Sequence, residues 1–191
     1  MEDKKNGFSK NTALIIIDVQ EGFDDPVWGT RNNPEAESNI AALLETWRNS
    51  GRPIIHIRHN SLNTKSPLHP DSQGNAIKEI VKPEAGELVI TKSVNSAFIG
   101  TDLEEILRDK GYETLVITGL TTNHCVSTTA RMAANLGFKT YVVSDAVAAF
   151  DLIDHTGKHY TAEEIHDISL ANLHDEFAEI LDSESVLADL E

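Results

Sequence analysis

Short apolar runs that are rich in β-branched residues recur along the chain, and amphipathic segments separate them. The runs are Ala13–Ile17, Pro53–Ile57, Leu88–Thr91, Thr114–Thr118 and Thr140–Val143. They show little alternation of apolar and polar positions, which is typical of strands covered on both faces in a parallel sheet. A sixth run, Phe177–Leu181, is interrupted by Glu179, which predicts a strand at the edge of the sheet.

The intervening segments carry the start and stop signals of helices. Starts are predicted at Asn33–Pro34, at Thr101 with Glu104, and at Thr161 with Glu164. Glycines close three of the predicted helices, at Gly51, Gly111 and Gly137. Strands that alternate with helices predict an α/β fold, a three-layer αβα sandwich whose open, mainly parallel, Rossmann-like sheet has about six strands. The length suits one domain, which we expect to cover residues 1–191.

The charge balance restricts the partners of this protein. Asp and Glu outnumber Lys and Arg by 31 to 16, which gives a formal net charge of -15. Nucleic acids and anionic membranes require a basic face, so neither is an expected partner, and a small-molecule substrate is. The chain has one cysteine, which excludes an internal disulfide, and its first ten residues contain no apolar signal segment. These features predict a cytoplasmic protein.

Three reactive side chains lie where three of the predicted strands end. Asp18 follows the first run, Lys92 follows the third, and Cys125 follows the fourth through a glycine-containing turn. Ligands bind beyond the carboxyl ends of the strands in an open parallel sheet, so these side chains are expected to share one edge. Residues DVQEGFDD after the first run offer no glycine-rich loop for a phosphate, which argues against a nucleotide-binding module.

Each of these residues also has an ordinary structural interpretation. A lone cysteine is often a small buried apolar residue, an aspartate at a strand end is often a turn former, and a lysine is usually on the surface. Together they form a sensible chemical unit, because a carboxylate can take a thiol proton beside a cation. A helix N-terminus and a nearby Lys92 also favour the thiolate of Cys125, so we expect its pKa to be lowered.

The residues around these positions resemble the isochorismatase-like cysteine hydrolase superfamily. The resemblance covers nearly the whole chain, through ALIIIDVQEGF, KSVNSAFIGTDLEEIL, GLTTNHCVSTTARMAANLGF and SDAVAAF. It implies a catalytic triad of Asp18, Lys92 and Cys125 on a Rossmann-like sheet. It also implies a cis peptide bond at Leu120–Thr121 and an oxyanion hole formed by the backbone N–H groups of Thr121 and Cys125. Members usually form dimers or tetramers, so a homodimer or homotetramer is expected.

The branches of this superfamily differ in chemistry. The isochorismatase branch cleaves a vinyl ether and does not require the cysteine, so Cys125 favours hydrolysis of a small-molecule amide through a thioester. The nicotinamidase branch binds a metal through an Asp-x-His pattern after the second strand, where this chain has His59 and Asn60. We therefore expect no metal and no cofactor. A vinyl ether hydrolase and a non-catalytic binding protein on the same fold stay open as alternatives.

The remaining candidates concern the substrate pocket. Residues expected to line it are Phe23, Trp28, His59, Asn60, Asn95, Phe98, Leu120 and His124. The aromatic members could instead pack in the core or between subunits. Asn60–Gly86 is polar, contains prolines and lacks periodicity, which predicts a long functional loop.

Overall fold

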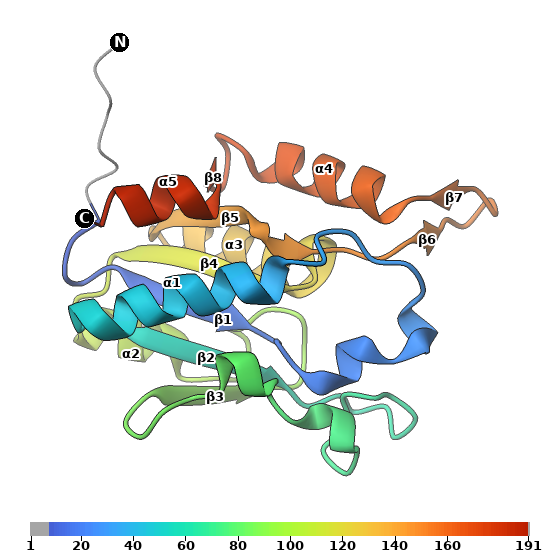
Figure 1. Cartoon of the computed structure of the whole chain (residues 1–191), viewed down its shortest axis with the longest axis horizontal. Helices are drawn as coiled ribbons and strands as arrows, with labels where there is room; N and C mark the ends of the chain where they lie inside the picture. Colours follow the sequence, from blue (N-terminus) through green and yellow to red (C-terminus); the bar gives the residue numbers. More distant parts are fainter. Residues whose placement is uncertain (1–7, 191) are drawn as a thin grey trace.

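The computed structural model describes residues 8–190, which are organised by one six-stranded parallel sheet (Figure 1). The strands lie in the order β3-β2-β1-β4-β5-β8. Their bounds are β1 Ala13–Ile17, β2 Ile54–His59, β3 Leu88–Lys92, β4 Thr114–Leu120, β5 Lys139–Ala148 and β8 Glu179–Leu181. The predicted fold class is confirmed, and the interrupted sixth run forms an edge strand as expected.

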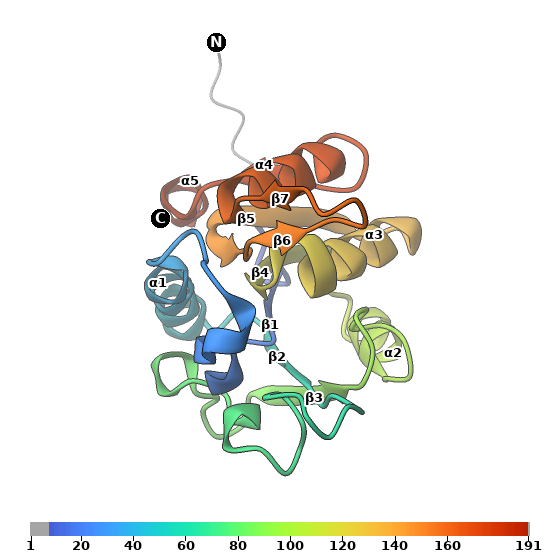
Figure 2. The same cartoon turned by 90° about the vertical axis from the view of Figure 1, so that its right-hand side faces the viewer.

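Helices cover both faces of the sheet. Their bounds are α1 Ala36–Ser50, α2 Leu103–Asp109, α3 Ser127–Asn135, α4 Ala162–Leu173 and α5 Ser183–Ala188. Helices α1 and α5 lie on one face, and α2 and α3 lie on the other (Figures 1 and 2). Leu14 and Ile16 of β1 pack towards α1, whereas Ile15 and Ile17 pack towards α2 and α3. Burial on both faces explains why this strand is a continuous apolar run. Within residues 8–190, no helix has the length and apolar character needed to cross a membrane.

The predicted start of the first helix is wrong by two residues. Helix α1 begins at Ala36, and Glu35 occupies its N-cap position. Asn33 instead has a positive φ of 44°, and its side-chain amide donates hydrogen bonds to the carbonyl oxygens of Ser144 and Val147, at 2.9 and 2.8 Å. Asn33 therefore connects the entry of α1 to strand β5 instead of capping the helix.

One of the two predicted capping boxes forms. The Thr161 side chain accepts from the backbone of Glu164, and the Glu164 side chain accepts from the backbone of Thr161, at the start of α4. Thr101 instead donates its hydroxyl to the Ala97 carbonyl at 2.5 Å and accepts from the Leu103 N–H at 3.4 Å, and the N-cap residue of α2, Asp102, makes no side-chain cap. The glycines predicted to end helices all have positive φ, as expected.

Several elements have no counterpart in the sequence predictions. Strand β5 continues to Ala148, five residues beyond the predicted run, and β6 Leu152–Ile153 pairs with β7 His159–Tyr160 as a hairpin. Helix α5 and four short 3₁₀ turns are also additional: η1 Glu21–Asp24, η2 Pro26–Trp28, η3 Gln73–Asn75 and η4 Glu79–Val81. The Asn60–Gly86 loop packs closely on η1, because a Cβ atom at Gly74 would lie 2.7 Å from the Gly22 Cα.

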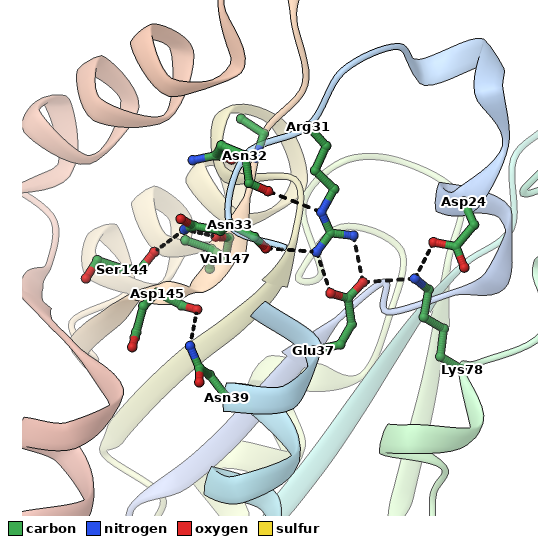
Figure 3. Close-up of polar contacts among 11 residues, drawn as sticks. Asp24, Arg31, Asn32, Asn33, Glu37, Asn39, Lys78, Ser144, Asp145 and Val147 are labelled. Atoms are coloured by element: carbon green, nitrogen blue, oxygen red, sulfur yellow. Dashed lines mark hydrogen bonds and ion pairs between the residues drawn. The ribbon is translucent and has the colours of Figure 1, made fainter. Parts of the chain in front are cut away.

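A polar network joins the segment after β1 to the start of α1 (Figure 3). Glu37 of α1 accepts hydrogen bonds from both terminal nitrogens of Arg31, and Lys78 donates to the same carboxylate at 2.9 Å. Lys78 also pairs with Asp24 at 2.5 Å. Burial disfavours ionised Glu37, but the hydrogen bonds from Arg31 and Lys78 prevail and lower its pKa from 4.5 to about 2.

We predict that Glu37→Gln destabilises the fold at neutral pH by about 2 kcal/mol, after allowance for solvent screening. Because the folded-state pKa lies below the unfolded one, the contribution is present above about pH 4.5 and is lost as the pH falls towards about 2. Urea unfolding of the wild type and the variant at about pH 7 and about pH 3 measures this. Glu105→Gln, at an exposed position of α2, is the matched control. An equal loss of stability at both pH values would contradict the role of the ionised carboxylate.

Candidate active site

The candidate site lies where the chain changes direction across the sheet. From β1 the chain builds β2 and β3 on one side, whereas β4, β5 and β8 lie on the other. Neighbouring β1 and β4 therefore bound the crevice where parallel α/β sheets bind ligands. Asp18 follows β1, Lys92 ends β3, and Cys125 follows β4, so all three reach this crevice from the carboxyl ends of their strands.

The ammonium group of Lys92 is the centre of the site. Its Nζ lies 2.6 Å from Asp18 Oδ2, 3.2 Å from Cys125 Sγ and 3.0 Å from His59 Nδ1, and it also donates to the Val94 carbonyl at 3.1 Å. The side chains of Lys92 and Asp18 are both 0% exposed. The structure thus brings together the three residues that the strand ends predicted, and it adds His59 as a fourth contact.

Local backbone geometry sets the positions of these groups. Asp18 has a positive φ of 52°, and its N–H donates to the Ile57 carbonyl at 2.9 Å. Gly119 has φ 114°, and a Cβ atom there would lie 2.0 Å from the Ile17 carbonyl oxygen. Glycine is therefore required where β4 passes β1, six residues before Cys125. The Leu120–Thr121 peptide bond is cis, as the resemblance implied.

Cys125 lies in one turn of π-helix, Thr122–Val126, that leads directly into α3. The hydroxyl of Thr122 and His166 Nδ1 of α4 lie 3.0 Å apart, in a buried contact that anchors this turn. Leading N–H groups of a helix have no carbonyl partner within it. Cys125 thus combines a thiol with a backbone N–H that is suited to an oxyanion.

The protonation state of the Cys125 thiol differs from the expectation of a lowered pKa. Burial and the neighbouring Asp18 carboxylate raise the pKa of the Cys125 thiol to about 12, and Lys92 offsets this only in part. Burial also raises the pKa of Asp18, against the opposing effect of Lys92. The prediction of a lowered thiol pKa is therefore wrong, because it counted the cation and the helix terminus but not the burial or the carboxylate. The resting site holds a neutral thiol beside an ion pair.

His59 is held by its backbone as well as by Lys92. Gln20 accepts from the His59 N–H at 2.8 Å and donates to its carbonyl at 3.0 Å, and Asn75 donates to the same carbonyl at 3.0 Å. Burial, with the charge of Lys92, lowers the pKa of His59 to about 4. The imidazole is therefore neutral at physiological pH, and it can accept a hydrogen bond from Lys92.

Metal-ligating atom types occur together in this site. Atoms of Asp18, His59 and Cys125 that could serve as ligands lie within 4.8 Å of one another. Lys92 Nζ contacts all three side chains, so its positive charge occupies the centre of the cluster. A divalent cation would have to displace that ammonium group, because two cations at such a separation repel strongly.

A pocket of about 340 Å³ opens beside Cys125. The expected residues that line it are Phe23, Trp28, His59, Asn95, Thr121, His124 and Cys125. Three other expected residues do not line it. Asn60 accepts a hydrogen bond from Asn75, Phe98 stacks on Phe138 in the core, and Leu120 is fully buried.

Six pocket residues were not anticipated from the sequence. They are Val27, Leu68, Asn123, Phe150, Asp151 and Leu152. The last three follow β5, whose end was placed at Val143 instead of Ala148. The strand-end rule that located Asp18, applied at the true end of β5, would have found them. Leu68 shows that the Asn60–Gly86 loop contributes to the pocket.

One wall of the pocket is aromatic. The ring centroid of Phe23 lies 5.1 Å from that of Trp28 and 6.2 Å from that of Phe150, and the Trp28 and Phe150 centroids lie 6.0 Å apart. Trp28 Nε1 donates to the Gly22 carbonyl at 2.7 Å, which fixes the indole ring. Arg31 pairs with Phe150 in an isolated antiparallel bridge. Arg31 also belongs to the polar network in Figure 3, so this network supports the aromatic wall.

Known proteins are similar to this chain in fold and in sequence. The family model for the Isochorismatase domain matches residues 12–185. The uncharacterized isochorismatase family protein YrdC of Bacillus subtilis (strain 168) is 56% identical over 99% of this chain and 97% of its own length. The crystal structure of a putative hydrolase of the isochorismatase family from Chromobacterium violaceum is 46% identical, with a TM-score of 0.92 over 95% of this chain and 94% of that one.

A relative with a named activity also matches. The maleamate amidohydrolase of Pseudomonas putida is 32% identical over 74% of this chain and 74% of its own length. The family model covers far more than half of the chain, and it spans the segments that carry Asp18, Lys92 and Cys125. The chain therefore belongs to the isochorismatase family of hydrolases.

Proposed function

We propose that this protein hydrolyses the C–N bond of a small carboxamide, with Cys125 as nucleophile, Asp18 as base and Lys92 as the charge that holds both. The observation that carries this proposal is the Lys92 ammonium group, which lies within 3.2 Å of both the Asp18 carboxylate and the Cys125 sulfur. A thiol is a good nucleophile for acyl transfer once a neighbouring base removes its proton. The maleamate amidohydrolase relative supports an amide as the substrate class.

The first half of the reaction forms a thioester. Cys125 Sγ attacks the amide carbonyl carbon, and its proton moves to Asp18. The Oδ1 atom of Asp18 is buried and has no hydrogen-bond partner among the described residues, so it is suited to take that proton. The raised pKa of Asp18 makes the carboxylate a stronger base for the thiol proton, and the protonated Asp18 then donates that proton to the leaving nitrogen. The C–N bond breaks, and ammonia or an amine departs.

The second half of the reaction returns the enzyme to its resting state. A water molecule attacks the thioester carbonyl while Asp18 accepts one of its protons. The C–S bond breaks, the sulfur regains a proton from Asp18, and the carboxylic acid leaves. In both halves the oxygen of the tetrahedral intermediate is placed near the backbone N–H groups of Thr121 and Cys125, which would stabilise it as an oxyanion hole.

We predict that Cys125→Ala lowers amide hydrolysis by about 10³-fold or more and that Asp18→Asn lowers it by about 10²–10⁴-fold, because each variant lacks one partner of the proton transfer. Ammonia release from a panel of small primary amides, including maleamate, measures the loss. Asp71→Asn, whose side chain is 93% exposed, is the matched control. Near-normal turnover by Asp18→Asn would refute the assignment of the base. Retained hydrolysis of a vinyl ether by Cys125→Ala would instead favour the isochorismatase-type alternative.

We predict that the resting thiol reacts slowly with iodoacetamide at about pH 7, since its pKa is about 12. Asp18→Asn removes the negative charge that disfavours the thiolate, so alkylation should become about tenfold faster or more even though turnover falls. Cys125 is the one cysteine in the sequence, so intact mass reports its labelling directly. Slower labelling of Asp18→Asn than of the wild type would contradict the assigned protonation states.

A further inference from the structure

The pocket beside Cys125 has an unusual charge composition for a site that binds polar amides. Among the residues that line it within the described part of the chain, the two histidines are His59 and His124, and there is no lysine or arginine. Burial lowers the pKa of both histidines, so neither is expected to be positively charged at neutral pH. Lys92 lies behind the thiol with a fully buried side chain, and the Asp18 carboxylate balances its charge.

The carboxylate in the lining belongs to Asp151. Its position is fixed from two sides: Oδ1 accepts the Ala162 N–H at the start of α4 at 2.7 Å, and Oδ2 lies 3.0 Å from His159 Nε2. Its backbone N–H donates to the Thr30 carbonyl at 2.9 Å, next to the bridge between Arg31 and Phe150. The same bridge places Phe150 in the aromatic wall. The Asp151 side chain is 25% exposed, so the carboxylate is at the mouth of the pocket and not free in solution.

The remaining lining is apolar and limited in size. Phe23, Trp28 and Phe150 form one wall, and Leu68 and Leu152 contribute further apolar surface. A volume of about 340 Å³ is at the small end of ligand pockets, so it suits an acyl group of roughly one ring. Flat groups stack well on such a wall.

We propose that this pocket selects flat, apolar carboxamides that carry no anionic group, and that Asp151 is the residue that discriminates against carboxylate-bearing substrates. A substrate carboxylate would meet a fixed like charge at the mouth and would find no cationic side chain in the lining to pair with. The net charge of -15 acts in the same direction over a longer range. This inference rests on the proposed amidase function for its substrate class, whereas the selection by charge can be measured without turnover.

Isophthalamide and its mono-acid, 3-carbamoylbenzoate, differ in charge at one substituent and have nearly the same shape. We expect ammonia release to show a kcat/KM at least about tenfold higher for the diamide, after correction for its two amides, because like charges repel in a poorly hydrated site. Asp151→Asn keeps an oxygen for the Ala162 N–H. This variant should reduce the ratio of the two kcat/KM values several-fold, mainly because kcat/KM for the mono-acid rises. Asp167→Asn, at an exposed position of α4 outside this pocket, should leave the difference unchanged. Equal efficiency with both amides, or the same difference in Asp151→Asn, would overturn the proposal.

Alkylation provides a readout that does not depend on amidase activity. Iodoacetamide and iodoacetate react with a thiol at the same carbon and differ in charge. The experiment is done at about pH 8, above the ordinary titration range of histidine. We expect the ratio of the iodoacetamide rate to the iodoacetate rate at Cys125 to be about tenfold higher in the folded protein than in the urea-unfolded protein. Asp151→Asn should lower this ratio, and Asp167→Asn should not. If the iodoacetamide-to-iodoacetate ratio were the same in the folded and the unfolded protein, the proposed selection against anionic groups would be overturned. A high ratio without turnover of any amide would instead overturn the proposed function alone.

Discussion

The arrangement of this site depends on the buried ion pair between Lys92 and Asp18. Removing two charges from water costs several kcal/mol for each ion, and the pair is stable only when its geometry and additional hydrogen bonds compensate. The structure supplies both, because Lys92 Nζ has four polar contacts for its three N–H groups, from the residue after β1, from β2, from the loop after β3 and from the π-helix. The ion pair thus sets the relative positions of these elements, and the thiol is placed as one more contact of the same ammonium group.

Burial and the same pair together explain why the Cys125 thiol stays protonated at rest. Burial is the largest cause that raises the pKa of the thiol, the Asp18 carboxylate adds to it, and Lys92 offsets them only in part. Transfer of the thiol proton to Asp18 leaves the total charge of the cluster unchanged, so the step requires no counter-ion from solvent. An oxygen of Asp18 that lacks a partner among the described residues is consistent with this transfer. In the proposed reaction, the thiol is therefore activated by proton transfer to Asp18 and is not a permanent thiolate.

Sequence reasoning located the triad because a simple rule applies to it: reactive side chains that follow apolar strands meet at one edge of a parallel sheet. The rule failed where strand ends were misplaced, so Phe150 and Asp151 were missed when β5 was ended at Val143 instead of Ala148. Asn60 and Phe98 lie next to site residues along the chain, but hydrogen bonding to Asn75 and stacking on Phe138 turn them away from the pocket. Such contacts depend on partners far apart in sequence. The capping boxes differ for a local reason: the Thr161 box formed, whereas the Thr101 hydroxyl donates to the Ala97 carbonyl four residues earlier in the chain.

The cluster of Asp18, Lys92 and Cys125 and the pocket wall are built on different supports. The cluster lies at the ends of strands β1, β3 and β4 of the central sheet, and close packing at Gly119 leaves little freedom there. The wall comes from the segment after β1 and the segment after β5, which are joined by the pairing of Arg31 with Phe150. Arg31 is held in turn by Glu37 of α1 (Figure 3). A substitution in Phe23, Trp28 or Asp151 can therefore alter the shape or charge of the pocket without moving the side chains of Asp18, Lys92 and Cys125. Reactive side chains at the ends of sheet strands and a pocket wall on separately braced loops allow the wall to vary while the cluster stays fixed.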